Sequence, residues 1–230
     1  MSQSGTASPS LTTPLSTSAE PCPGPSCTSW WYARCSLALL LTAAVLAWHA
    51  RETLTRFPPG FQEKDPLPFL QNDHPLHYYY SQVTADFFAH RRSFWGYDPN
   101  FMAGYAKTMI FPTGCSLPEL VAIVCGKNSV RAFRLFVASC VFLPPIFLAL
   151  AARTMAQRWS AAMLALLLGV AWVWISWPTI YVIWGMAPFV MGITSSLWGA
   201  TLLAHWLDTR SRGSLVAGVC VATLATIAHP

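Results

Sequence analysis

Charged residues are scarce in this chain of 230 residues. Asp, Glu, Lys and Arg together make up 10% of it, whereas 54% is hydrophobic. Because soluble domains carry about 25% charged residues, this shortage excludes an ordinary soluble domain and indicates a polytopic membrane protein. The formal net charge is +5, but the Lys and Arg residues are scattered at the ends of apolar runs. No single basic face results, which excludes a nucleic-acid partner.

Several motifs of soluble chemistry are also missing. The chain has no glycine-rich phosphate loop, no Ser/His/Asp order and no HExxH motif, so soluble nucleotide chemistry is unsupported. Its seven cysteines include no CxxC pair, and those within apolar runs, Cys35, Cys140 and Cys220, are predicted to be buried thiols. The apolar runs after Phe133 contain no acidic residue before Asp208. These runs therefore lack the acidic side chains that a proton or ion relay requires.

Apolar runs of membrane-crossing length follow a polar tail. Residues 1–28 are rich in Ser, Thr and Pro and are predicted to be disordered. The first apolar run, residues 30–50, begins too far from the N-terminus for a cleaved signal peptide, so we interpret it as a signal anchor. About 20 apolar residues cross a bilayer, and the later predicted spans are residues 133–152, 161–177, 187–207 and 214–230. The predicted fold class is all-α, a polytopic transmembrane helix bundle.

Residues 109–126 are ambiguous between a short span and a re-entrant segment, because Pro118 and Glu119 interrupt them. The positive-inside rule favours a segment that does not cross. The arginines near the ends of the other spans then face the cytoplasm: Arg34, Arg153, Arg158, Arg210 and Arg212. Under this topology the large first loop, residues 51–108, and the short loop Trp177–Gly185 share the non-cytoplasmic face.

The candidate chemistry lies in a polar, aromatic-rich part of loop 51–108. Ionisable groups at a membrane surface are costly unless they serve a function, and Asp73 stands two residues before Pro75. Asp73 has two compatible interpretations, a general base for a hydroxyl and the N-cap of a helix that begins near Pro75. Leu76–His90 is predicted to be an interfacial helix. Its apolar and aromatic residues recur at spacings of four: Tyr79, Val83 and Phe87.

The histidines and arginines of this loop also have two interpretations each. His74 and His77 are three residues apart and fall on one helix face, where they would bind substrate or ligate a metal with a neighbouring aspartate. The alternative is an ordinary interfacial position. Arg91 and Arg92 are candidate ligands of a lipid-linked phosphate, because guanidinium groups offer paired donors to phosphate oxygens. Their alternative is snorkelling towards lipid headgroups.

The aromatic residues that follow suit either a sugar or a membrane surface. Trp95, Tyr97 and Tyr105 would stack on the C–H face of a pyranose, or would belong to an aromatic belt at the bilayer surface. Asp98 stands directly before Pro99, a pair that favours a turn over a second catalytic acid. The sequence therefore predicts Trp95, Tyr97 and Tyr105, but not Asp98, as substrate contacts.

The order of these features resembles that of membrane glycosyltransferases with the GT-C architecture. An early span precedes an external loop with an Asp, a Trp-x-x-x-Pro-x-x-x-x-Gly-Tyr motif, a proline-containing segment and short-looped spans. The matching residues are Asp73-His74, Trp95, Pro99, Gly104-Tyr105, Phe111-Pro112, Leu117-Pro118 and His229-Pro230. The chain is most similar to the membrane family labelled "6-pyruvoyl-tetrahydropterin synthase-related", and more loosely to the dolichyl-phosphate-mannose transferase group. No pterin chemistry is implied by that label.

The resemblance implies an integral protein of a bacterial inner membrane that transfers a sugar from a polyprenyl-phosphate-linked donor. The acceptor would lie on the non-cytoplasmic face, with Asp73 as the catalytic residue. The implied substrate-binding residues are His74, His77, Arg91, Arg92, Trp95, Tyr97 and Tyr105. No metal ligand or cofactor is assigned, although a divalent metal is compatible with the family. The lipid bilayer and the lipid-linked donor are the implied partners.

Two other function classes stay open at the level of sequence. A transporter-like bundle would need charged residues along a pathway, and the predicted spans have none at their centres. A non-catalytic membrane scaffold, whose loop serves a partner, is compatible with every pattern above. The chain stops at His229-Pro230 directly after an apolar run, which predicts a protein truncated at its C-terminus.

Overall fold

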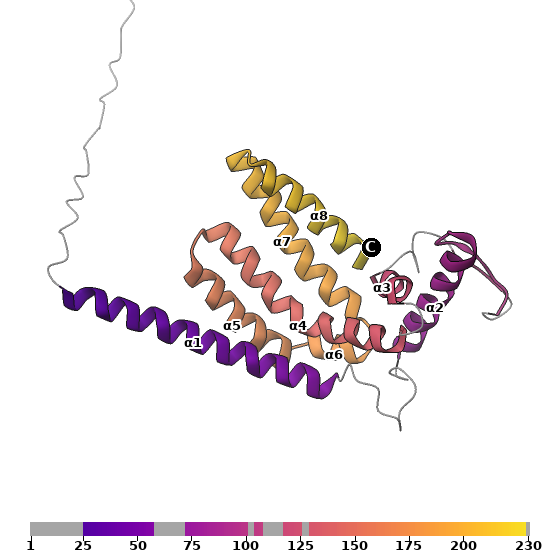
Figure 1. The fold of residues 1–230 in the computed structure, drawn as a ribbon, viewed down its shortest axis with the longest axis horizontal. Coiled ribbons are helices and arrows are strands. Elements are labelled where there is room, and N and C mark those ends of the chain that lie inside the picture. The colour runs from indigo at the N-terminus through magenta and orange to yellow at the C-terminus, as the bar shows by residue number, and fades with distance from the viewer. Residues whose placement is uncertain (1–24, 58–71, 101–103, 108–116, 126–128, 229–230) are drawn as a thin grey trace, which may run out of the picture. The chain divides into compact units, whose positions relative to one another are not determined.

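The computed structural model describes residues 25–57, 72–100, 104–107, 117–125 and 129–228 (Figure 1). These residues form eight helices and one two-stranded hairpin. The helices are α1 (Pro25–Arg56), α2 (His74–Arg91), α3 (Leu117–Cys125), α4 (Ser129–Ala156), α5 (Trp159–Ile175), α6 (Pro178–Ile183), α7 (Ala187–Thr209) and α8 (Arg212–Ala228). In the hairpin, β1 (Gly96–Asp98) runs antiparallel to β2 (Tyr105–Lys107). The all-α class is confirmed for the described residues, and the hairpin is an addition that the sequence patterns did not predict.

The described part of the ambiguous segment 109–126 is the nine-residue helix α3. At a rise of 1.5 Å per residue α3 is about 14 Å long, roughly half of the hydrocarbon core of a bilayer. Residues 108–116 lie outside the described residues, and so do residues 1–24 of the predicted tail. The helix α3 by itself is therefore too short to cross a membrane.

Proline stands in the first turn of five of the described helices, at Pro25 in α1, Pro75 in α2, Pro118 in α3, Pro178 in α6 and Pro188 in α7. The first turn of a helix leaves its N–H groups without intrahelical partners, so the missing N–H of proline costs nothing there. The fixed φ angle of proline also suits the first helical residues. These prolines explain locally where each of the five helices begins.

In the part of the chain that the structure describes, three helices are long and apolar enough to cross a membrane: Ser36–Arg56 within α1, Val130–Ala156 within α4, and Ala187–Thr209, which is α7. Helices α5 and α8 are apolar but shorter, at 17 residues each. The three candidate spans suggest an integral membrane protein. Contact with the lipid bilayer follows from the same observation.

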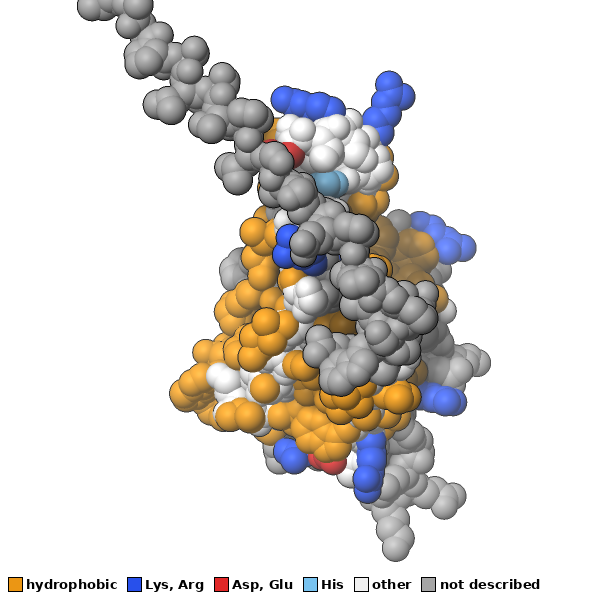
Figure 2. Space-filling model, turned by 90° about the vertical axis from the view of Figure 1, so that its left-hand side faces the viewer, with side chains coloured by type: hydrophobic (Ala, Val, Ile, Leu, Met, Phe, Trp, Pro, Cys, Tyr) orange, Lys and Arg blue, Asp and Glu red, His pale blue; other side chains and the backbone are white. Residues whose placement is uncertain are grey.

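Large apolar side chains on the outside of these helices support that conclusion. Leu168 on α5, Ile193 on α7 and Val219 on α8 expose half or more of their surface. Extensive exposed apolar surface marks a membrane or protein contact. On the face drawn in Figure 2, hydrophobic side chains occupy the described middle region, and Lys and Arg side chains lie mostly towards its margins.

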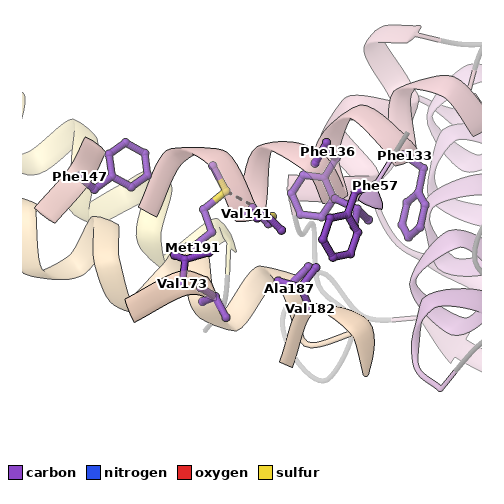
Figure 3. Packing of buried hydrophobic residues seen from close by; sticks show 13 residues of the cluster. Phe57, Phe133, Phe136, Val141, Phe147, Val173, Val182, Ala187 and Met191 are labelled. Carbon is purple, nitrogen blue, oxygen red and sulfur yellow. Dashed lines mark hydrogen bonds between the residues drawn. The ribbon is translucent and has the colours of Figure 1, made fainter. Parts of the chain in front are cut away.

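The helices pack around α4. The chain divides into two compact units, Met1–Leu40 and Leu41–Pro230, and all contacts below lie in the second. Helix α4 packs against α5 and α7, and α7 packs against α8. The core cluster joins side chains of α4, α5, α6 and α7, among them Val141, Val173 and Met191 (Figure 3). Close packing of α7 on α8 is possible because a Cβ at Gly199 would lie 3.2 Å from the backbone N of Ala222.

A buried histidine links three helices where α4 contains two prolines. Pro144 and Pro145 remove two backbone N–H donors from the interior of α4. His49 of α1 lies against this part of α4, where its Nε2 donates to the carbonyl of Phe142 at 3.2 Å and its ring stacks on the Phe142 ring. Trp174 of α5 donates from Nε1 to Nδ1 of His49 at 2.9 Å. His49 therefore satisfies polar groups of α4 and α5 within an apolar region.

Replacing either partner of the His49–Trp174 hydrogen bond is expected to destabilise the fold. We expect His49→Phe and Trp174→Phe each to lower the free energy of unfolding by about 1–2 kcal/mol, the upper range for interhelical hydrogen bonds in membranes. Unfolding of the purified protein in detergent measures this value. Trp172→Phe is the matched control, because Trp172 is a neighbour on α5 whose side chain is more than a third exposed. Equal effects of Trp174→Phe and Trp172→Phe would contradict the linking role.

Candidate functional site

The start of α2 is fixed against the turn between α6 and α7. The backbone N–H of Asp73 donates to the carbonyl of Trp184 at 3.3 Å. The side chain of His74 donates from Nε2 to the carbonyl of Val182 at 2.7 Å. These two hydrogen bonds place the start of α2 beside Trp177–Gly185, the segment expected to share its face of the membrane. Which face that is stays a prediction. The segment Trp177–Gly185 was predicted to be a loop, and most of it is the helix α6.

Gly185 makes this close approach of the two segments possible. It ends α6 with φ +89°, a left-handed conformation that favours glycine. Its N–H donates to Val182 at 3.0 Å and the N–H of Met186 donates to Tyr181 at 2.8 Å, the pattern of a Schellman motif. A Cβ at Gly185 would lie 2.7 Å from the backbone N of His74 and 2.8 Å from Cβ of Asp73. The glycine is therefore required both by its own turn and by the position of Asp73.

Asp73 occupies the N-cap position of α2 without using its carboxylate as a cap. Its backbone angles are φ −84° and ψ −7°, and its side chain makes no capping hydrogen bond. The residue is exposed, whereas its backbone is held by Trp184 on one side and by the N–H of His77 on the other. The backbone of Asp73 is thus fixed while its carboxylate is exposed. The carboxylate would accept a proton if Asp73 is a general base, and it would accept a backbone N–H if Asp73 is a side-chain N-cap.

His74 is a positioning residue in this arrangement. Its side chain is buried at 2% exposure and lies edge-on to the ring of Phe133 on α4, at 6.1 Å between ring centroids. Burial lowers the pKa of His74, and the hydrogen bond to the Val182 carbonyl partly opposes that shift. A neutral imidazole with its proton on Nε2 matches this donor role. The buried His74 attaches the start of α2 to α6 and α4. Its predicted contact with substrate stays a prediction.

The histidine pair does not assemble a metal site within the described residues. His77 is half-buried one turn after Asp73. Across the described part of the chain, no three His, Cys, Asp or Glu side chains come close enough together to hold a metal ion. The proposed ligation by His74, His77 and an aspartate thus has no geometric support among these residues.

The other predicted contacts lie at the far end of α2. The guanidinium of Arg91 lies 5.7 Å from the ring centre of Phe87, and that of Arg92 lies 5.6 Å from that of Phe88. Trp95 and Tyr97 follow and are more than half exposed. The backbone of Tyr105 pairs with Asp98 in the hairpin, and its side chain lies outside the described residues.

The length of α2 separates the predicted site into two places. The helix has 18 residues, so its ends are about 27 Å apart at a rise of 1.5 Å per residue. Asp73, His74 and His77 belong to the first end, and Arg91 and Arg92 to the second. In this arrangement an arginine at the second end cannot contact a sugar that touches Asp73.

A pocket of about 380 Å³ with a mixed polar and aromatic lining lies between α2 and the Asp98 turn. Tyr79, Phe87 and Tyr97 supply its aromatic walls, and its polar lining comes from Gln82, Asp86, Arg91, Asp98 and Asn100. Asp98 was expected to form a turn, and its Oδ1 does accept the N–H of Asn100 at 3.0 Å. Its Oδ2 also accepts the hydroxyl proton of Tyr79 at 2.6 Å. The stripe at spacings of four, Tyr79, Val83 and Phe87, therefore lines this pocket.

The hydrogen bond to Asp98 raises the pKa of Tyr79 from 10.0 to about 12. The folded protein holds this proton to higher pH than the unfolded chain does, so the contribution of the bond to folding is complete below about pH 10 and is lost as the pH rises through 12. Ultraviolet titration of wild type minus Tyr79→Phe should show one phenol that ionises late. Asp98→Asn should bring that ionisation to lower pH, and an unchanged midpoint in Asp98→Asn would contradict the assignment.

Sequence reasoning missed several buried polar residues. The sequence indicates only a turn at Asp98, although this residue is 4% exposed and its carboxylate accepts a hydrogen bond from Tyr79. Glu119 on α3 and Arg134 on α4 are 1% and 4% exposed, and α3 packs against both α2 and α4. Buried charges of this kind need compensating partners. The sequence could have indicated the buried Glu119, because it is an acidic residue within a short apolar segment.

A second hollow, of about 510 Å³, lies on the apolar face of α7. It is lined by Phe189, Gly192, Ile193, Ser196, Leu197 and Ala200. None of these side chains ionises, and all of them belong to a candidate membrane span. Its composition suits apolar packing in a membrane and offers no group for catalysis.

Comparison of the chain with protein-family models gives no match, and comparisons with curated proteins and with solved structures give no significant match.

Proposed function

We propose that this chain is a membrane glycosyltransferase that uses Asp73 as its general base. The donor would be a sugar linked to a polyprenyl phosphate, and the acceptor a hydroxyl on the non-cytoplasmic side. The resemblance to the GT-C architecture suggests this class. The three candidate membrane spans are compatible with it, since a polyprenyl donor is itself held in the bilayer.

The transfer step requires one carboxylate that is positioned to act as a general base. The acceptor oxygen attacks the anomeric carbon, and the bond from that carbon to the phosphate oxygen breaks. Polyprenyl phosphate leaves with the electron pair, and Asp73 takes the proton of the acceptor hydroxyl. No redox step and no further co-reactant are needed.

The main support for the proposal is that the Asp73 side chain is exposed and is not used as a helix cap. Asp73 is exposed and makes no capping hydrogen bond, so its carboxylate is available to accept a proton. Its backbone is held by Trp184, and the neighbouring His74 is fixed to Val182. A base on a fixed backbone can meet the acceptor in a defined geometry, which is a requirement of efficient proton transfer.

Transfer can be measured directly with labelled donors. The full chain would be reconstituted in lipid vesicles with polyprenyl-phosphate hexoses and pentoses carrying a radioactive sugar, together with a membrane extract as the source of acceptor. We expect the label to leave the lipid fraction and polyprenyl phosphate to be released in equal amounts. Vesicles without the chain give the background. Label movement that equals this background with every donor would contradict the proposal.

A further inference from the structure

The pocket between α2 and the Asp98 turn has no role in the transfer step described above, because Arg91 on its wall lies at the opposite end of α2 from Asp73. We propose that this pocket binds a neutral saccharide through its hydroxyl groups. The inference goes beyond the proposed transferase activity and does not depend on catalysis by Asp73. Its volume of about 380 Å³ lies at the small end of the range of ligand sites, about 300–1,000 Å³, which suits a ligand of one or two sugar rings.

The polar lining combines donors and acceptors, as sugar hydroxyls require. Arg91 can only donate, and the carboxylate of Asp86 can only accept. Gln82 offers an amide that does both. A hydroxyl group donates one hydrogen bond and accepts others, so adjacent hydroxyls on a sugar ring match such a mixed lining.

The aromatic lining supplies flat apolar surfaces beside these polar groups. Tyr97 is 56% exposed and forms one wall with Tyr79 and Phe87. A sugar ring has apolar C–H faces as well as polar edges. Ligand sites generally combine apolar and aromatic walls with a few placed polar groups. The lining of this pocket contains both kinds of surface.

Two contacts hold the pocket in shape before any ligand arrives. Asp98 fixes the hydroxyl of Tyr79 at 2.6 Å, and this phenol donates its proton to the carboxylate. Gly96 brings β1 close to α2, because a Cβ at this position would lie 2.9 Å from the ring of Phe87. A preformed pocket costs less ordering on binding, which favours even a small ligand.

The charges of the lining disfavour two other ligand classes. A phosphate group would meet the carboxylates of Asp86 and Asp98 beside one arginine. A quaternary ammonium group would find aromatic walls but also the guanidinium of Arg91. A neutral polyhydroxyl ligand avoids both repulsions, and it can use Gln82, Asp86 and Arg91 as hydrogen-bond partners.

Ligand-observed NMR with the purified full chain tests the proposal, in a detergent without a sugar headgroup, since maltoside and glucoside detergents would compete. The probes are the methyl glycosides of glucose, mannose and galactose. We expect at least one of them to bind. Arg91→Gln and Tyr97→Leu should each weaken that binding by about tenfold, the effect of losing one hydrogen bond from a charged donor or one aromatic wall.

Arg92→Gln is the matched control, since Arg92 is the next residue along the chain and is not part of the pocket lining. It should leave glycoside binding unchanged, and so should Asp73→Asn. Loss of transfer in Asp73→Asn with unchanged glycoside binding would separate the two proposals. The saccharide site is contradicted if no glycoside binds up to its solubility limit, if Arg91→Gln and Arg92→Gln behave alike, or if choline or inorganic phosphate binds more tightly than every glycoside.

Discussion

Asp73→Asn is expected to lower the rate of sugar transfer by about 100-fold or more, which is the usual contribution of a general base. Asparagine is as good an N-cap residue as aspartate, so the substitution removes the basic carboxylate and keeps the capping ability. The midpoint of thermal unfolding should therefore stay the same. Transfer rates with the labelled polyprenyl donor and a thermal scan of the same preparation give both values.

Two further variants separate catalysis from capping at this position. Asp208→Asn is the matched control, because Asp208 is an exposed aspartate near the end of α7, and it should keep full activity. Asp73→Ala should be inactive and, because the carboxylate makes no capping hydrogen bond, should lose less stability than the cost of about 1 kcal/mol that is typical of a lost N-cap. An Asp73→Asn protein that transfers sugar at the wild-type rate would remove Asp73 from the mechanism.

Gly185→Ala is expected to lower the free energy of unfolding by about 2–5 kcal/mol, the largest loss of stability that we predict for a single methyl group in this chain. Two costs combine. At φ +89° an alanine is strained, and its Cβ would lie within 2.9 Å of three atoms of Asp73 and His74. Backbone atoms and a Cβ atom cannot rotate away, so α2 itself must move. Denaturant unfolding in detergent measures the loss.

Gly213→Ala is the matched control for that substitution. Gly213 lies in the first turn of α8, and a Cβ there would come no closer than 3.7 Å to the hydroxyl of Ser211. Alanine favours a helix over glycine by about 0.5–1 kcal/mol, so this variant should be as stable as the wild type or more stable. Equal stability of Gly185→Ala and Gly213→Ala would contradict the close contact between the start of α2 and the α6–α7 turn.

Local sequence patterns predicted those structural features that depend only on residues close together in the chain. The lengths of the apolar runs predicted a helical membrane protein, because burial in lipid requires about 20 apolar residues whatever the rest of the chain does. Pro75 predicted the start of α2, and Asp98-Pro99-Asn100 predicted a turn, which the hydrogen bond from Asn100 to Asp98 confirms. Each of these signals acts within a few residues, so a single sequence is enough to detect it.

The candidate site was harder to predict because its residues meet across long stretches of chain. His74 and Val182 are 108 residues apart, and nothing in the local pattern of either distinguishes a histidine that donates to a carbonyl from one that binds substrate. The pocket at Asp98 depended on Tyr79 reaching a carboxylate 19 residues later. The stripe Tyr79, Val83 and Phe87 predicted one side of an interfacial helix, but it could not show that this side lines a pocket with the Asp98 turn. Of the three residues only Phe87 is buried, whereas Tyr79 and Val83 are half-buried.

The sequence by itself thus determined the class of the molecule: apolar helices of membrane-crossing length, with an aspartate placed before a proline at a helix start. Only the tertiary structure decided that Asp73 is exposed and not used as a cap, and that His74 is buried against α6. It also placed Arg91 and Arg92 at the other end of α2, apart from Asp73. The physical reason is range: propensity and hydrophobic length act along the chain, whereas burial and hydrogen bonding of a side chain depend on which distant segments pack beside it.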